Sequence, residues 1–129
     1  MSKPLNDVIM EALTDLRGKD IVSLDVSELT DVMDTLVIVS GTSNRHVKSL
    51  VDNVVEESKA AGYRPLGVEG KEDGEWVLVD LGDTVVHAMI PSAREFYDLE
   101  KLWSLEPSGR KGKGQDMGQD MSEDQFLSE

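Results

Sequence analysis

A β-hairpin between residues 76 and 90 constrains the fold of this chain more than any other segment. Its two arms, 76–80 and 84–90, are short, rich in valine and bounded by turn residues, which is typical of strands. The intervening Gly82-Asp83 suits a two-residue type II′ turn, because glycine occupies the first central position. Such a turn fixes the register of the two strands. The predicted facing pairs are Leu81–Thr84, Asp80–Val85, Val79–Val86, Leu78–His87, Val77–Ala88 and Trp76–Met89.

The two faces of this hairpin differ in character, because successive side chains of a strand point to opposite sides. One face has small aliphatic side chains, as expected of a sheet face that packs in the core, and carries Val77, Val79, Val86 and Ala88. The other carries Trp76, Leu78, His87 and Met89. If helices cover only the first face, the second is an exposed apolar surface with a tryptophan anchor, which marks a binding site. The alternative is that a helix covers this face too and that Trp76 is ordinary core.

Apolar periodicity predicts the elements on either side of the hairpin. The patterns indicate helices over 4–17, about 43–61 and 91–103, and strands over 20–26, 36–39 and 64–69. The first two strands lack a long crossover and are expected to be antiparallel or offset neighbours, whereas the last three form a meander. The predicted fold class is therefore α+β (α/β-like), with a mixed five-stranded sheet and helices packed mainly on one face.

Helix ends and faces give more detailed expectations. Gly18 suits the C′ position after the first helix, and Thr42 or Ser43 suits the N-cap of the second. The free N–H groups near Gly41 could hold an anion, but a glycine turn with a Ser or Thr cap is the simpler interpretation.

In the third helix, Phe96, Leu99 and Trp103 fall on one stripe and are predicted to be core. Arg94 can pair with Asp98 four residues later. Tyr97 lies off the stripe and is expected to be exposed, as aromatic side chains at interfaces are.

The charge of the chain limits its partners. Its 26 acidic and 13 basic residues give a net charge of −13, which opposes binding to nucleic-acid phosphates and favours a basic protein partner. Solubility alone also explains such acidity. The absence of cysteine excludes disulfides and cysteine-based metal sites, and no apolar run is long enough to span a bilayer. A cytoplasmic protein without a membrane contact is expected.

Carboxylates at strand ends raise the question of catalysis. Asp34, Glu69, Asp80 and Asp83 could in principle build a Mg²⁺ site. No strand carries the Asp-x-Asp pair that would direct two carboxylates at one metal, and turn carboxylates are usually solvated. We therefore expect no catalytic residue, metal or cofactor. The alternative is a metal-dependent nucleotidyltransferase that uses Ser43 with these acids.

Residues 1–104 are predicted to form one domain, and residues 105–129 a disordered acidic tail, because this last segment shows no periodicity. Within the domain, several motifs in order resemble the ribosomal silencing factor (Iojap-like) family over about residues 4–104. These motifs are Gly41-Thr-Ser-Asn-Arg-His46, Gly67-Val-Glu-Gly70, the 76–83 segment, Val86-His87 and the 94–103 segment. One departure is Thr35-Leu36 behind Asp34, where many relatives carry an aromatic residue.

The resemblance implies a nucleotidyltransferase-like fold without known transferase activity. It also implies binding to the large ribosomal subunit through its protein number fourteen, at the face that meets the small subunit. A bound factor would then block subunit joining sterically and lower translation when nutrients are scarce, with little direct nucleic-acid contact. The implied contact residues are Glu69, Gly70, Trp76, Leu78, Asp80, His87, Met89 and Tyr97, whereas Arg94 is assigned a structural role. A homodimer through the same face is a further alternative.

Overall fold

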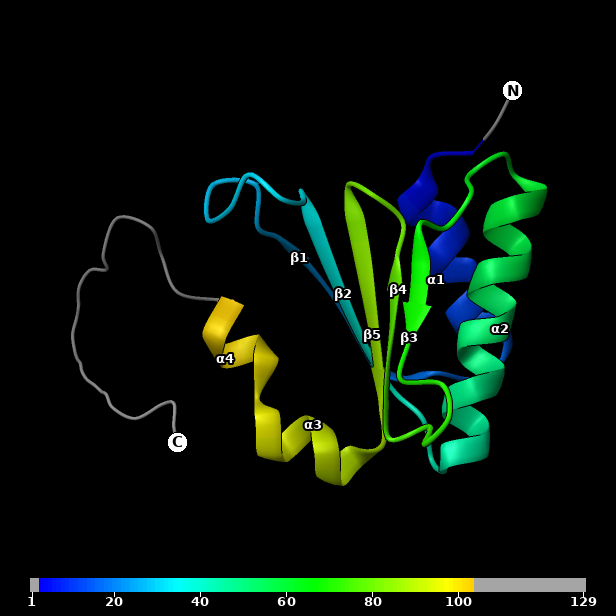
Figure 1. Ribbon diagram of the computed structural model, residues 1–129, viewed down its shortest axis with the longest axis vertical. Coiled ribbons are helices and arrows are strands. Elements are labelled where there is room, and N and C mark those ends of the chain that lie inside the picture. Colours follow the sequence, from blue (N-terminus) through cyan, green and yellow to red (C-terminus); the bar gives the residue numbers. More distant parts are fainter. Residues whose placement is uncertain (1–2, 104–129) are drawn as a thin grey trace.

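A computed structural model describes residues 3–103 of the chain, and within this range the fold is a five-stranded mixed sheet with helices on both sides (Figure 1). The sheet order is β1-β2-β5-β4-β3, with β2 parallel to β5 and every other neighbouring pair antiparallel. The strands are β1 (Lys19–Asp25), β2 (Thr35–Ser40), β3 (Gly67–Glu69), β4 (Trp76–Asp80) and β5 (Thr84–Met89). The helices are α1 (Leu5–Asp15), α2 (Asn44–Ala60), α3 (Pro91–Tyr97) and α4 (Leu99–Trp103). The predicted α+β class with a mixed five-stranded sheet is confirmed.

The two longer helices, α1 and α2, lie side by side on one face of the sheet, and the short α3 and α4 lie beside the opposite face (Figure 1). The main core is the layer between the sheet and α1 and α2. It contains Ile9 and Leu13 from α1, Leu50 and Val54 from α2, and the aliphatic face of the hairpin. Every side chain on that hairpin face is fully buried: Val77, Val79, Val86 and Ala88.

The hairpin has the predicted register. The pairs from Trp76–Met89 to Asp80–Val85 all face one another. The Leu81 N–H donates to the Thr84 carbonyl at 2.9 Å, and Gly82 has a φ of +93°, as the first central residue of a type II′ turn requires. The turn chemistry of two residues therefore decides which side chains face the helices and which face away.

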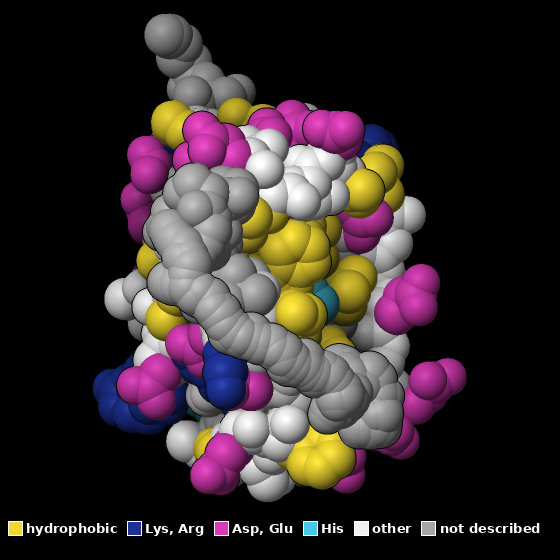
Figure 2. Space-filling view, turned by 90° about the vertical axis from the view of Figure 1, so that its left-hand side faces the viewer, with side chains coloured by type: hydrophobic (Ala, Val, Ile, Leu, Met, Phe, Trp, Pro, Cys, Tyr) yellow, Lys and Arg dark blue, Asp and Glu magenta, His cyan; other side chains and the backbone are white. Residues whose placement is uncertain are grey.

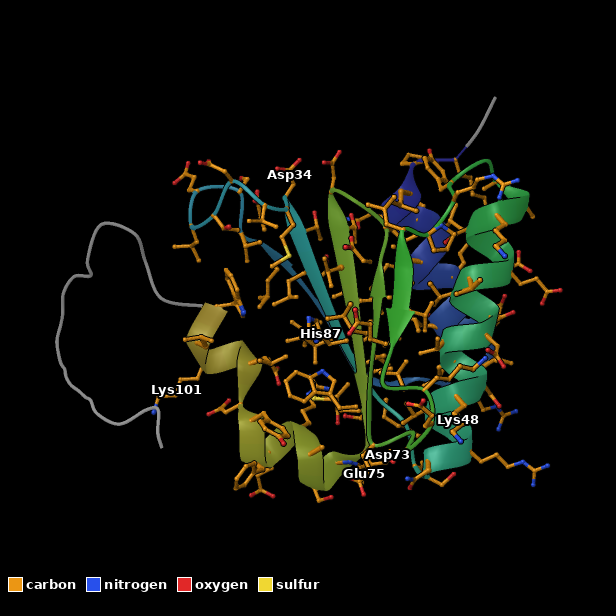
Figure 3. The ribbon with its side chains drawn as sticks, viewed as in Figure 1. Asp34, Lys48, Asp73, Glu75, His87 and Lys101 are labelled. Atoms are coloured by element: carbon orange, nitrogen blue, oxygen red, sulfur yellow. The ribbon has the colours of Figure 1, made fainter. Side chains whose placement is uncertain are left out.

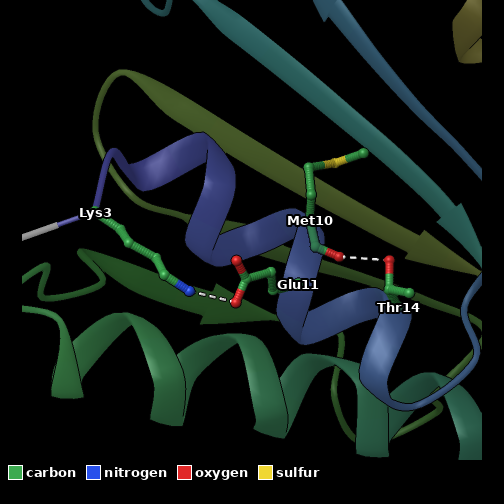
Figure 4. A network of polar contacts seen from close by, with 4 residues as sticks. All are labelled: Lys3, Met10, Glu11 and Thr14. Carbon is green, nitrogen blue, oxygen red and sulfur yellow. Dashed lines mark hydrogen bonds and ion pairs between the residues drawn. The ribbon is translucent and has the colours of Figure 1, made fainter.

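Packing rather than surface pairing holds α1 to the sheet. On its exposed side, the Lys3 ammonium pairs with Glu11, and the Thr14 hydroxyl donates to the Met10 carbonyl at 2.7 Å (Figure 4). Exposed ion pairs contribute little, typically below about 1 kcal/mol. The opposite side of the helix buries Val8, Ile9, Ala12 and Leu13, and this apolar area supplies the larger stabilisation.

The end of α1 differs from the prediction. The left-handed C′ residue is Arg17, with a φ of +62°, whereas Gly18 is the next residue and donates its N–H to the Leu13 carbonyl at 2.8 Å. The prediction of Gly18 at C′ is therefore wrong. Glycine is needed there for a different reason, because a Cβ at this position would lie 2.7 Å from the Val39 side chain.

The third predicted strand and helix are shorter than expected. Strand β3 begins only at Gly67, after Pro65, which has no N–H to donate to a ladder. The predicted helix over 91–103 is divided at Asp98, whose left-handed backbone (φ +49°, ψ +54°) ends α3. The break places Leu99 and Trp103 on a different helix from Phe96, so the three no longer share one stripe. Phe96 is 80% exposed, and its assignment to the core is wrong. Leu99 and Trp103 were also predicted to be core, but they are only partly buried and pack against the edge of a core cluster.

The predicted tail over 105–129 lies outside the described residues. Among the helices of residues 3–103, none combines the length and the apolar character that crossing a bilayer would need.

Candidate functional site

The second face of the sheet lies beside helices α3 and α4 (Figure 1), and it carries an apolar surface with several side chains that are only partly buried. Four fully buried side chains form its base, and partly buried ones surround them. The base is Val26, Leu36, Ile38 and Met89, and the surrounding side chains are Leu24, Leu29, Met33, Trp76, Val85, Ala93, Leu99 and Trp103. Figure 2 shows this surface as a central apolar area with Asp and Glu side chains around it. We call it the Trp76 face.

Three aromatic rings from β4 and α3 form one group on the Trp76 face. The rings of Trp76 and Tyr97 have their centroids 4.4 Å apart, and Phe96 meets Tyr97 edge-on at 5.0 Å. Trp76 is partly exposed, and Tyr97 is 50% exposed, as the sequence predicted for this tyrosine. Large rings with one open side supply contact area at low conformational cost, which is why such residues dominate protein interfaces.

His87, labelled in Figure 3, lies beside Trp76 and is only 8% exposed. Its Nδ1 accepts a hydrogen bond from the Trp76 indole N–H at 2.9 Å. Burial lowers the pKa of His87 to about 4, because desolvation disfavours the charged imidazolium. The ring is therefore neutral at physiological pH, with its remaining proton on Nε2.

Arg94 joins α3, α4 and the sheet. Its Nε donates to Glu100 at 2.8 Å, and its Nη1 donates to the Ser40 hydroxyl at 2.9 Å. The same hydrogen bond with Arg94 lowers the pKa of Glu100. The predicted pairing of Arg94 with Asp98 is wrong, because the break at Asp98 brings Glu100 to the guanidinium instead. These contacts fit the structural role that the resemblance assigned to Arg94.

The predicted contact residues Glu69, Leu78 and Asp80 lie on the same face. Glu69 pairs across the sheet with Leu78, and both acids retain solvent exposure at the edge of the apolar surface. Met89 faces the same way but is completely buried, so it supports the Trp76 face from below. The structure thus brings the predicted side chains together in one layer, with differing solvent exposure.

Gly70 shapes the backbone behind Trp76. Its φ of +86° is in the left-handed region, and a Cβ there would lie 2.2 Å from the Trp76 carbonyl oxygen. Glycine at this position therefore allows the backbone at residue 70 to lie close to the backbone at Trp76.

Sequence reasoning missed two features of this region. Phe96 is available on the Trp76 face, but the signal that exposes it is the left-handed backbone at Asp98, which no local pattern showed. Val32, in the connection between β1 and β2, is 81% exposed, and its neighbours Leu29 and Met33 pack against the Trp76 face.

The start of α2 is occupied by internal contacts. Ser43 caps the helix by accepting from the His46 N–H, and the His46 ring bridges the Thr42 N–H and the Leu16 carbonyl, each at 2.8 Å. Of the two predicted N-cap candidates, Ser43 is therefore the one that caps α2.

The strand-end acids also have local roles. The Asp80 carboxylate accepts from the Gly82 N–H at 2.9 Å, and Asp34 lies on the connection beside β2 (Figure 3). In the part of the chain that the structure describes, no three His, Asp or Glu side chains form a group that could hold a metal.

Comparison with known proteins identifies the family. The model of the family described as "Ribosomal silencing factor during starvation" matches residues 1–127. The chain belongs to the ribosomal silencing factor family. This family is not known for enzymatic activity, and membership supports a ribosome-associated silencing role.

Curated silencing factors match over most of their length. The chain is 48% identical to the ribosomal silencing factor of Chromobacterium violaceum over 99 residues, which are 77% of this chain and 81% of that protein. It is 45% identical to that of Haemophilus influenzae over 100 residues, covering 78% and 98%. A mouse protein named "Mitochondrial assembly of ribosomal large subunit protein 1" is 37% identical over 77% of this chain and 45% of its own length.

Solved structures agree with this assignment to the silencing factors. A crystal structure of a protein from Chromobacterium violaceum aligns with a TM-score of 0.77 at 47% identity, covering 84% of this chain and 91% of that one. One from Bacillus halodurans aligns with a TM-score of 0.70 at 31% identity, covering 77% and 92%.

Proposed function

We propose that this silencing factor binds the large ribosomal subunit through its protein number fourteen and excludes the small subunit by its bulk, thereby repressing translation. Family membership supports the ribosomal setting. The observation that carries the choice of surface is the partly exposed Trp76–Tyr97 pair on an apolar sheet face with acids around it (Figure 2).

The Trp76 face has the composition of a protein interface. Interfaces commonly combine an apolar, aromatic centre with a polar rim, and tryptophan and tyrosine are common anchors. Here the centre is Trp76, Tyr97 and Leu78, and the rim includes Glu69 and Asp80. An apolar surface of this kind would be costly to leave in water without a partner.

Charge supports a basic protein as the partner. A net charge of −13 repels the phosphates of ribosomal RNA and attracts a cationic surface. The encounter should therefore be steered by charge, and the association rate should fall as salt is raised. Tight contact then depends on the few aromatic anchors at the centre.

Co-sedimentation with purified large subunits tests the surface. We expect Trp76→Ala to weaken binding by about 2 kcal/mol or more, which is roughly 30-fold, as removal of a central interface anchor does. Leu16→Ala is the matched control, because Leu16 is an apolar side chain 37% exposed at the end of α1, away from the Trp76 face. Equal binding by the two variants would refute the assignment of this surface.

A homodimer would use the same apolar surface and would compete with the ribosome. Light scattering of the purified chain tests this, and Trp76→Ala should shift any dimer towards monomer. A dimer that is unchanged by this substitution would use another surface.

A further inference from the structure

We infer that His87 is a positioning residue, which accepts the Trp76 indole N–H and thereby fixes the ring in the orientation that docks on the partner. This inference rests on the proposed function, because it explains how the anchor of that surface is set before binding. It gives His87 a role through Trp76 rather than through a contact of its own.

The strand register brings the two side chains together. Trp76 faces Met89 and Leu78 faces His87, so Trp76 and His87 are diagonal neighbours on the same side of the hairpin. Diagonal pairs are within reach of aromatic side chains. The ring centroids are 5.8 Å apart, and the N–H to Nδ1 distance of 2.9 Å is that of an ordinary hydrogen bond.

The hydrogen bond has only one possible direction. The indole nitrogen can only donate, so the His87 Nδ1 must be the acceptor and must carry no proton. Tyr97 packs against the indole at 4.4 Å. The hydrogen bond and the tyrosine contact together restrict the rotation of a ring that is only partly buried.

Exposure separates the roles of the three residues. Trp76 and Tyr97 can contact a partner, because both retain open surface. His87 is 8% exposed and offers almost no area of its own. A side chain that must be immobilised on binding lowers affinity, and a ring that is already fixed avoids that loss. The benefit of His87 is therefore expected in affinity for the partner.

Three substitutions at position 87 test the inference. His87→Leu keeps a similar apolar volume but removes the acceptor, and it should weaken binding to purified large subunits by about 3- to 10-fold, the range of such ordering costs. His87→Asn keeps an acceptor oxygen two bonds beyond Cβ, where Nδ1 lies, and should stay within about 2-fold of the unsubstituted chain. His87→Val is a second acceptor-free variant if His87→Leu does not fold.

A double-mutant cycle distinguishes positioning from direct contact or general packing. Trp76→Phe removes the indole N–H, so adding His87→Leu to it should cause no further loss of binding. A loss of the same size with or without Trp76→Phe would overturn the inference, as would equal losses in His87→Leu and His87→Asn.

The Trp76 indole N–H resonance, assigned by its loss in Trp76→Phe, gives a readout that needs no ribosome. It should move in His87→Leu and stay close to its original position in His87→Asn. An unmoved resonance in His87→Leu would overturn the inference and leave the proposed function standing. Failure of the unsubstituted chain to bind large subunits would overturn the proposed function, and the docking role of Trp76 with it.

Discussion

Acid should destabilise this protein through His87. The pKa of this side chain falls from 6.5 in the unfolded chain to about 4 in the folded one, because burial disfavours the charged ring. Between these two pH values the unfolded state binds more protons, so the free energy of unfolding decreases as pH falls through this window. Protonation of Nδ1 would also remove the acceptor of the Trp76 indole N–H.

The size of the effect follows from the two pKa values. The full change between 6.5 and about 4 corresponds to about 3.4 kcal/mol. By pH 5 the folded ring is still mostly neutral while the unfolded one is almost fully charged, so about 2 kcal/mol of that stability is already lost. This is a large share of the net stability of a small domain, which is about 5–15 kcal/mol.

Urea unfolding at pH 7.5 and pH 5 measures this loss. The control is His87→Asn, which keeps an acceptor for Trp76 but does not titrate, so it should lose about 2 kcal/mol less than the unsubstituted chain. Carboxyl groups such as Glu100 contribute equally to both proteins and cancel in the comparison. Equal losses in the two proteins would refute the reasoning.

Three further substitutions and one control test the packing, each by urea unfolding. Gly70→Ala should cost about 1–3 kcal/mol, because it combines a strained φ with a backbone clash, whereas Gly67→Ala, which meets nothing within 4 Å, should cost less than about 1 kcal/mol. Ser58→Ala should stabilise by up to about 1 kcal/mol, because the Ser58 hydroxyl is buried without a partner among the described residues. Arg94→Lys should cost about 1–2 kcal/mol, because one ammonium cannot replace the guanidinium contacts to both Glu100 and Ser40.

Local chemistry explains what the sequence predicted well. The hairpin register agrees with the Gly82-Asp83 turn, and the cap of α2 depends on Ser43, which contacts a residue three positions later. Both are interactions between near neighbours, which a pattern can contain. The division of the hairpin into a core face and a second, partly open face followed directly from that register.

Tertiary contacts explain what the sequence did not show. The break at Asp98 accompanies the Arg94–Glu100 contact, which joins α3 to α4 across that break. Aspartate visits the left-handed region more readily than most residues, but no spacing rule shows when it does. The burial of Met89 likewise depends on side chains from distant segments. The hydrogen bond between the His46 ring and the Leu16 carbonyl joins positions that are 30 residues apart.

The most direct test of the account is a subunit-joining assay with the unsubstituted chain, Trp76→Ala and Leu16→Ala. Large subunits are preincubated with each protein and mixed with small subunits, and the joined ribosomes are measured on a gradient. The account predicts that the unsubstituted chain and Leu16→Ala prevent joining, whereas Trp76→Ala needs roughly 30-fold more protein for the same effect. Undiminished inhibition by Trp76→Ala, or joining that is unaffected by the unsubstituted chain, would contradict it.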